Sequence, residues 1–324
     1  MASIREVAKE AGVGVGTVSR ALNGNGYVAE ETKKRILEIA KKLDYNPNEM
    51  ARNLSSKRTG IIGIVVPDIE NPFWGRYLKY VEICLYNHGF KSLICNTIGV
   101  SNREQDFIDF LKRKAIDGII VAAHSLNDEA YLELKQPVVS FERDMGPTIP
   151  QVCSNHEQGG RFAAEKLLKA GCKRVIQLGG TYNGRTPADE RHHEFKRVME
   201  AAGAHVTTIE MSWDLVGYDH YRKIMESYME LFTKVDGIFT ADIGAYFCLA
   251  FAKKNGIKVP EQLKIIGFDG LEITRMSEPQ ITTIVQDVPA LARISVKCMI
   301  DMLKGKKPEA KYLVDVSIQE GGTV

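Results

Sequence analysis

Small and polar side chains, together with one arginine, follow a glycine-containing turn near the N-terminus. The turn is Gly12-Val13-Gly14, and the segment after it, Val15 to Asn23, reads Val-Gly-Thr-Val-Ser-Arg-Ala-Leu-Asn. A helix with such an outer face fits the major groove of DNA, where an arginine such as Arg20 can donate two hydrogen bonds to one guanine. These residue types therefore favour the reading of a DNA sequence.

Three short helices over residues 1–46 are predicted to hold this segment. Ser3 and Glu6 have the spacing of a capping box, and Gly12 is placed to end the first helix. The second helix follows the turn, and the third begins near Glu30. Apolar residues at spacings of three and four predict a shared core, made of Ile4, Val7, Ala8, Ala11, Val18, Ala21, Leu22, Ile36, Ile39, Ala40 and Leu43.

Charge is unevenly distributed along the chain. Residues 1–60 contain 11 lysines and arginines against seven acidic residues, whereas the rest of the chain has a small acidic excess. A basic head on a nearly neutral body indicates a polyanionic partner for the head alone. No run of eighteen apolar residues occurs, so neither a membrane span nor a membrane partner is expected, and the start of the chain lacks the apolar stretch of a signal peptide.

From residue 60 onward, short apolar runs alternate with amphipathic stretches of helical length. Parallel sheets covered by helices on both faces produce this pattern, and so many strands favour two doubly wound halves. Ligands of such sheets bind at the carboxyl ends of the strands. The expected strands are Ile61–Val66, Ser92–Cys95, Ile119–Ala123, Val138–Phe141, Val175–Leu178, His205–Ile209, Ile238–Ala241, Ile265–Phe268 and Leu313–Ile318.

Motifs for catalysis or for a metal site are not found. The chain has no G-x-S-x-G, P-loop or H-E-x-x-H sequence, and His192-His193 lacks the spacing of metal ligands. The six cysteines form no C-x-x-C pair and are expected to be reduced and mostly buried. We therefore expect neither an enzyme nor a metal or organic cofactor.

The segment Ile4 to Asn23 resembles the helix-turn-helix of the LacI/GalR repressor family, whose pattern is V-A-x-x-A-G-V-S-x-x-T-V-S-R-x-L-N. This chain departs from it at Gly14, where the family has serine. The resemblance implies that Val15, Gly16 and Arg20 face base edges. It also implies backbone or supporting DNA contacts for Thr17, Ser19, Asn23, Tyr27 and Thr32.

The linker at residues 47–59 resembles the hinge helix of the same family, which folds only on the operator. Its length allows about two turns of helix, too few to be stable alone in water. The resemblance implies that Leu54 enters the minor groove, with Asn48 and Ala51 beside it and Arg52 on the backbone. The alternative is a flexible tether without a role in DNA binding.

The resemblance continues through residues 60–324, where the family shares the fold of periplasmic sugar-binding proteins. It implies a small-molecule effector, a mono- or disaccharide, because charged side chains can serve the hydroxyl groups of a sugar while aromatic rings pack on its apolar faces. Ala241 stands where the family often has asparagine, and Glu142 where aspartate is common. The implied effector-binding residues are Phe73, Trp74, Glu142, Arg191, Trp213, Asp242, Asp269 and Gln286.

The expected organisation is thus an all-α helix-turn-helix head (1–46), a hinge (47–59) and an α/β body of two doubly wound parallel-sheet subdomains (60–324). The subdomain nearer the N-terminus is expected over about 60–157 and 288–312, and the other over 158–287 and 313–324. The resemblance implies a cytoplasmic, nucleoid-associated homodimer that represses transcription from a pseudo-palindromic operator. The alternatives are a sugar-binding transport protein, a doubly wound enzyme, or a global regulator whose co-repressor is a phosphorylated protein.

Overall fold

The computed structural model describes residues 2–23, 26–45, 58–97, 103–122, 128–179, 186–211 and 218–324. The chain divides into two compact units, Met1–Thr59 and Gly60–Val324. No helix among the described residues is long and apolar enough to cross a membrane.

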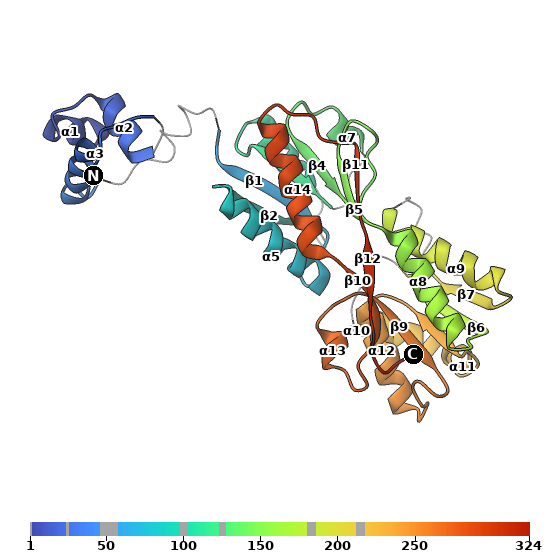
Figure 1. The fold of residues 1–324 in the computed structure, drawn as a ribbon. Helices are drawn as coiled ribbons and strands as arrows, with labels where there is room; N and C mark the ends of the chain where they lie inside the picture. The colour runs from blue at the N-terminus through green and yellow to red at the C-terminus, as the bar shows by residue number, and fades with distance from the viewer. Residues whose placement is uncertain are drawn as a thin grey trace. The chain divides into compact units, whose positions relative to one another are not determined.

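The first unit contains helices α1 (Ile4–Glu10), α2 (Val15–Asn23) and α3 (Glu30–Lys42) in its described part (Figure 1). The predicted capping box is confirmed, since the Ser3 hydroxyl accepts from the Glu6 amide and the Glu6 carboxylate accepts from the Ser3 amide. Gly12 follows the first helix with φ +62°, a conformation that glycine adopts at little cost. The expected core is also confirmed, with Val7, Val18 and Ile36 fully buried.

The second unit is built on two sheets, and each has six strands among the described residues (Figure 1). The first sheet has the order β11-β5-β4-β3-β1-β2, with all neighbours parallel. Its strands are β1 (Ile61–Val66), β2 (Lys91–Asn96), β3 (Gly118–Val121), β4 (Val138–Phe141), β5 (Gln151–Ser154) and β11 (Lys311–Val314). Its helices are α5 (Pro72–Asn87), α6 (Arg103–Lys112), α7 (Glu129–Leu132) and α14 (Val288–Leu303). We call these elements the first subdomain.

The second sheet has the order β12-β10-β9-β8-β6-β7, and the edge strand β12 is antiparallel to β10. Its strands are β6 (Arg174–Leu178), β7 (His205–Ile209), β8 (Gly237–Phe239), β9 (Lys264–Asp269), β10 (Thr282–Gln286) and β12 (Val316–Gln319). Its helices are α8 (His156–Lys169), η1 (Pro187–Asp189), α9 (Glu190–Ala201), α10 (Tyr218–Ser227), α11 (Met229–Phe232), α12 (Asp242–Lys254) and α13 (Ile273–Met276). These elements form the second subdomain.

The chain passes between the subdomains three times within the described residues, each time through one residue. Asn155 separates β5 from α8, Asp287 separates β10 from α14, and Asp315 separates β11 from β12. Asn155 and Asp287 cap the helices that follow them, and the Asn155 amide group donates to the Asp315 carboxylate at 3.0 Å. A hydrogen bond thus joins the first and third crossings, and we call the three crossings the junction of the subdomains.

Two features differ from the sequence-based expectation. The single strand expected over Leu313–Ile318 is wrong, because the chain leaves the first sheet at Val314 and joins the second at Val316. Strands β5 and β10 were not expected, since only two residues of each are apolar and glutamines, serine and threonines make up the rest. Their polar side chains are nevertheless buried.

Candidate functional site

Four polar side chains lie at the carboxyl ends of strands near the crossings. Glu142 follows β4, Ser154 ends β5, Asp269 ends β9 and Gln286 ends β10. Glu142 and Asp269 both have positive φ angles, +53° and +125°, which few residues other than glycine adopt. Such backbone outliers are typical of functional positions, where the surrounding structure compensates the strain.

A hydrogen-bonded row links the two subdomains at this point. The Gln286 side-chain amide donates to Asp269 Oδ1 at 2.8 Å, and its oxygen accepts from the Ser154 hydroxyl at 2.5 Å. Arg191 Nη1 lies 3.9 Å from the same Asp269 oxygen. The side chains of Arg191 and Asp269 stay 17% and 13% exposed, so a small polar molecule can reach both.

The ring of Phe268 contacts both an arginine and a histidine of the second subdomain. The guanidinium carbon of Arg191 is 4.5 Å from the ring centroid of Phe268, within the range of a cation–π interaction. The His156 ring stacks on Phe268 with centroids 5.5 Å apart. Phe268 therefore fixes the position of two polar side chains at once.

Glu142 and His156 form a buried pair that the sequence did not reveal. Glu142 Oε2 lies 2.6 Å from His156 Nε2, and Oε1 accepts from the Ser154 amide at 2.8 Å. The His156 Nδ1 atom is buried without a hydrogen-bond partner among the described residues. His156 opens α8 directly after the first crossing, and only its place beside Glu142 identifies it as a candidate binding residue.

The buried side chain of His192 contacts the guanidinium of Arg191. Its Nε2 lies 3.3 Å from Arg191 Nε, and burial together with the Arg191 charge holds the pKa of His192 well below its usual value. A neutral imidazole can accept this hydrogen bond, whereas an imidazolium would repel the guanidinium. The arginine is thus oriented by an uncharged partner.

Asp242 was expected to contact the effector, but the structure buries it completely at the start of α12. One carboxylate oxygen accepts from the Thr283 hydroxyl at 2.5 Å and the other from the Leu271 amide at 2.6 Å. Burial and the nearby charge of Asp269 raise the pKa of Asp242 to about 7, and burial raises the pKa of Asp269 as well. The arrangement favours a role in holding the turn after β9 over direct contact with a ligand.

The aromatic candidates divide into two kinds. Phe73 is buried and packs in the core of the first subdomain, stacked at 6.4 Å from Phe141. Trp74 is partly buried and meets Phe73 and Phe141 edge to face. Trp74 therefore remains the better candidate for an apolar wall, and Phe73 supports it.

In the first unit, the residues expected to face DNA lie mostly on the surface. Val15, Gly16, Arg20 and Tyr27 are exposed, Tyr27 at 90%. Thr17, Ser19 and Thr32 are partly buried. Arg20 Nε donates to Gly16 O at 3.2 Å, which lays the arginine along the outer face of α2. Several expected contact residues lie outside the described residues, namely Asn48, Ala51, Arg52, Leu54, Trp213 and the side chain of Asn23.

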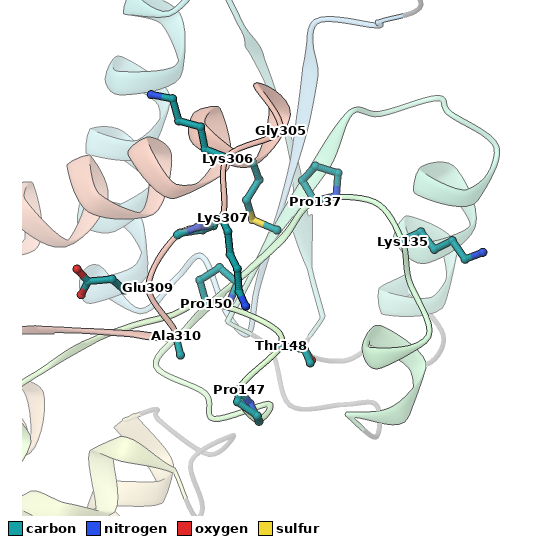
Figure 2. Close-up of a pocket in the computed structure, with 12 residues that line it drawn as sticks. Lys135, Pro137, Pro147, Thr148, Pro150, Gly305, Lys306, Lys307, Glu309 and Ala310 are labelled. Atoms are coloured by element: carbon teal, nitrogen blue, oxygen red, sulfur yellow. The ribbon is translucent and has the colours of Figure 1, made fainter.

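A separate pocket of about 550 Å³ lies at the opposite edge of the first sheet (Figure 2). Pro137, Pro150 and Ala310 in its wall directly precede β4, β5 and β11, so it opens at the amino ends of these parallel strands. Lys135, Lys306 and Lys307 also line it and are exposed. None of the candidate binding residues lines this pocket, so it is not part of the site at the crossings. The described residues contain no group of ligands that could hold a metal ion.

Comparison with protein families gives two matches. Residues 3–48 match the model described as bacterial regulatory proteins, lacI family, and residues 164–324 match a periplasmic binding protein-like domain. The first segment corresponds to the head. The second covers most of the second subdomain, together with α14 and β11 of the first subdomain.

Known proteins resemble the chain over nearly its whole length. A ribose operon repressor of Halalkalibacterium halodurans is 35% identical over 98% of this chain and 94% of its own. A sucrose operon repressor of Streptococcus mutans is 34% identical over the full length of both. A periplasmic binding protein/LacI transcriptional regulator from Alkaliphilus metalliredigens, solved with D-xylulofuranose, is 28% identical with a TM-score of 0.75, covering 82% of this chain and 99% of its own.

Proposed function

The chain belongs to the LacI family of bacterial regulatory proteins. We propose that it represses transcription from an operator and that binding of an uncharged sugar lowers or raises its affinity for this operator. Membership of this family makes it a DNA-binding transcriptional regulator and not an enzyme.

The observation that carries the proposal is the row Asp269–Gln286–Ser154 with Arg191 beside it. It offers both acceptors and donors across the junction of the subdomains, as vicinal hydroxyl groups require. A sugar bridging this row would contact both subdomains and so favour one relative arrangement of them.

The charges favour a neutral ligand over a phosphorylated one. Asp269 lies 3.9 Å from the Arg191 guanidinium, and Glu142 is paired with His156 at 2.6 Å, so each carboxyl group already has a nitrogen partner. A phosphate dianion would meet repulsion from both acidic side chains. Two observations favour a monosaccharide as the first candidate: the relative bound to D-xylulofuranose and the relative named for a ribose operon.

The DNA side of the proposal rests on the exposed face of α2. Val15, Gly16 and Arg20 would read base edges while Tyr27 and Thr32 contact the backbone. Residues 47–59 would form the hinge, with Leu54 entering the minor groove. An operator with two half-sites requires two heads, and a homodimer supplies them.

A homodimer also agrees with the exposed apolar residues of the first subdomain. Strand β2 is an edge strand, and its Leu93 and Ile94 are exposed, as are Ile83 and Tyr86 of α5. An exposed apolar sheet edge is a favourable surface for pairing. In the proposed dimer, a shift between subdomains would change the distance between the two hinges.

A two-stage experiment tests the proposal. The first stage is a thermal-shift screen of the full chain with D-ribose, D-xylulose, D-fructose, sucrose, cellobiose and ribose 5-phosphate. One of the neutral sugars should raise the melting temperature of the protein, since a ligand that binds the folded state stabilises it. The second stage measures the affinity for operator DNA by fluorescence anisotropy, with operators selected from randomised pseudo-palindromes. Adding that sugar should change the operator affinity at least fivefold. Stabilisation by ribose 5-phosphate alone would contradict the neutral ligand, and failure to select any DNA would contradict the repressor function.

A further inference from the structure

Arg76 joins the two subdomains close to the candidate effector residues. It lies on α5 of the first subdomain, and its Nη1 donates to the backbone oxygen of Gly270 at 2.7 Å. Gly270 follows Asp269 directly, at the end of β9 in the second subdomain. A guanidinium bond to a carbonyl is charge-assisted and therefore among the stronger hydrogen bonds in proteins.

The turn Asp269-Gly270-Leu271, which we call the closing turn, has a demanding backbone. Asp269 and Gly270 both have positive φ angles, +125° and +73°. A Cβ added at Gly270 would lie 2.7 Å from the Val285 side chain, so the position also requires glycine for space. The closing turn is thus defined by its surroundings and not by an intrinsic preference of its residues.

Asp242 holds the closing turn from the second subdomain. Its buried carboxylate accepts from the Leu271 amide at 2.6 Å and from the Thr283 hydroxyl, which tethers the turn to α12 and β10. A Cβ added at Gly267 would lie 2.2 Å from Asp242 Oδ1, so β9 leaves room for this carboxylate only through a glycine. The sequence thus provides a dedicated anchor for the turn.

Leu271 carries the closing turn into the first subdomain. Its side chain is 4% exposed and belongs to the same core cluster as Phe73 and Tyr77 of α5. The closing turn therefore begins at a carboxylate that faces the candidate effector site and ends in the core of the other subdomain. Arg76 binds the residue between these two ends.

We propose that Arg76 and the closing turn form a latch between the subdomains, through which an effector held by Asp269 acts on α5. Arg76 and Asp242 are positioning residues in this latch, because neither needs to touch the ligand. The inference rests on the proposed function for the identity of the effector, whereas the latch itself is a property of the chain without ligand.

The latch is tested by hydrogen–deuterium exchange on the full chain without sugar or DNA. R76A should accelerate exchange about ten- to hundredfold in peptides that cover residues 270–276, as loss of one charge-assisted hydrogen bond predicts. R76K keeps a donor and should restore part of the protection, and R76Q provides a second neutral variant if R76A folds poorly. K79A is the matched control, since Lys79 is an exposed cation on the same helix, and it should exchange like the wild type.

A spectroscopic signature separates a latch from a general loss of stability. Trp74 packs against the core cluster that contains Leu271, so its fluorescence reports on this contact once Trp213 is replaced in a W213F background. R76A should shift the emission to longer wavelength relative to K79A in that background.

The latch would be overturned by two results. One is faster exchange confined to peptides of α5, which would mean that Arg76 stabilises only its own helix. The other is exchange and emission identical to K79A. Neither result bears on operator or sugar binding, so the proposed function is judged separately by its own screen.

Discussion

The guanidinium of Arg191 lies 4.5 Å above the ring of Phe268, while the next residue in the chain, Asp269, is 3.9 Å from it. One arginine thus contacts an aromatic face and a carboxylate contributed by adjacent residues of β9. Neutral His192 accepts from Nε of the guanidinium, which leaves Nη1 toward Asp269.

Replacing Arg191 with alanine should weaken sugar binding by about 2–4 kcal/mol, because the sugar would lose a charged hydrogen-bond donor in a largely buried site. Isothermal titration calorimetry with the sugar found in the thermal-shift screen measures the loss. Arg197→Ala on the same helix is the control, since Arg197 is largely exposed and pairs with Glu194. Equal affinities for Arg191→Ala and Arg197→Ala would remove Arg191 from the site.

Replacing Arg20 with alanine should cost about 1–3 kcal/mol on the selected operator while affecting random DNA much less. The reason is that a base-reading arginine contributes to specific binding, whereas a backbone contact contributes to both. Anisotropy titrations on operator and scrambled duplexes at one salt concentration measure the two losses. Equal losses on both duplexes would assign Arg20 to the phosphate backbone.

Leu54→Ala should weaken operator binding and leave sugar binding unchanged. An apolar side chain between base pairs kinks the duplex and permits contacts that an alanine cannot support. The prediction rests on the sequence alone, since residue 54 lies outside the described residues. Gel-shift titrations with operator DNA check it, and an operator affinity equal to that of the wild type would show that Leu54 has no such role.

The stability of the wild type should fall as pH rises from about 4 to 7, relative to Asp242→Asn. The raised pKa of Asp242, about 7, means that the folded state holds a proton in this interval that the unfolded chain has released. Deprotonation on raising the pH therefore costs stability, by up to about 1.4 kcal/mol per pH unit. The difference in free energy of unfolding between the two proteins, from urea titrations at several pH values, reports on Asp242 together with Asp269, whose charge raises the pKa of Asp242. A difference that does not change with pH would contradict the shift.

Much of the fold could be predicted from the sequence because local signals agreed with the final packing. The Ser3–Glu6 capping box and the apolar runs of β1, β3 and β9 needed no tertiary information. Strand β10 escaped prediction because its threonines look solvent-exposed, whereas burial gives their hydroxyls protein partners, such as Asp242 for Thr283. The exchange between sheets at Asp315 was hidden because apolar residues continue on both sides of it.

The structure brings some of the predicted site residues together, although the sequence did not indicate how they are arranged. Arg191, Asp269 and Gln286 do come together in the structure. His156 could not be found from the sequence, since only the first crossing brings it to Glu142. Asp242 could not be told from a ligand-facing carboxylate until its two hydrogen-bond donors were known.

Biosynthesis of this chain must accommodate the exchange of strands at Asp315. Strands β11 and β12 are each an outer strand of a different sheet, and both follow every other strand of the described residues in the sequence. Thr323, further on, is buried and donates to Ile265 O of β9. Both sheets therefore keep an unpaired edge until the segment with β11 and β12 has been translated. A nascent chain interrupted before this segment would expose the unpaired edge strands of both sheets, which can pair with other chains. Such a chain would need protection by chaperones.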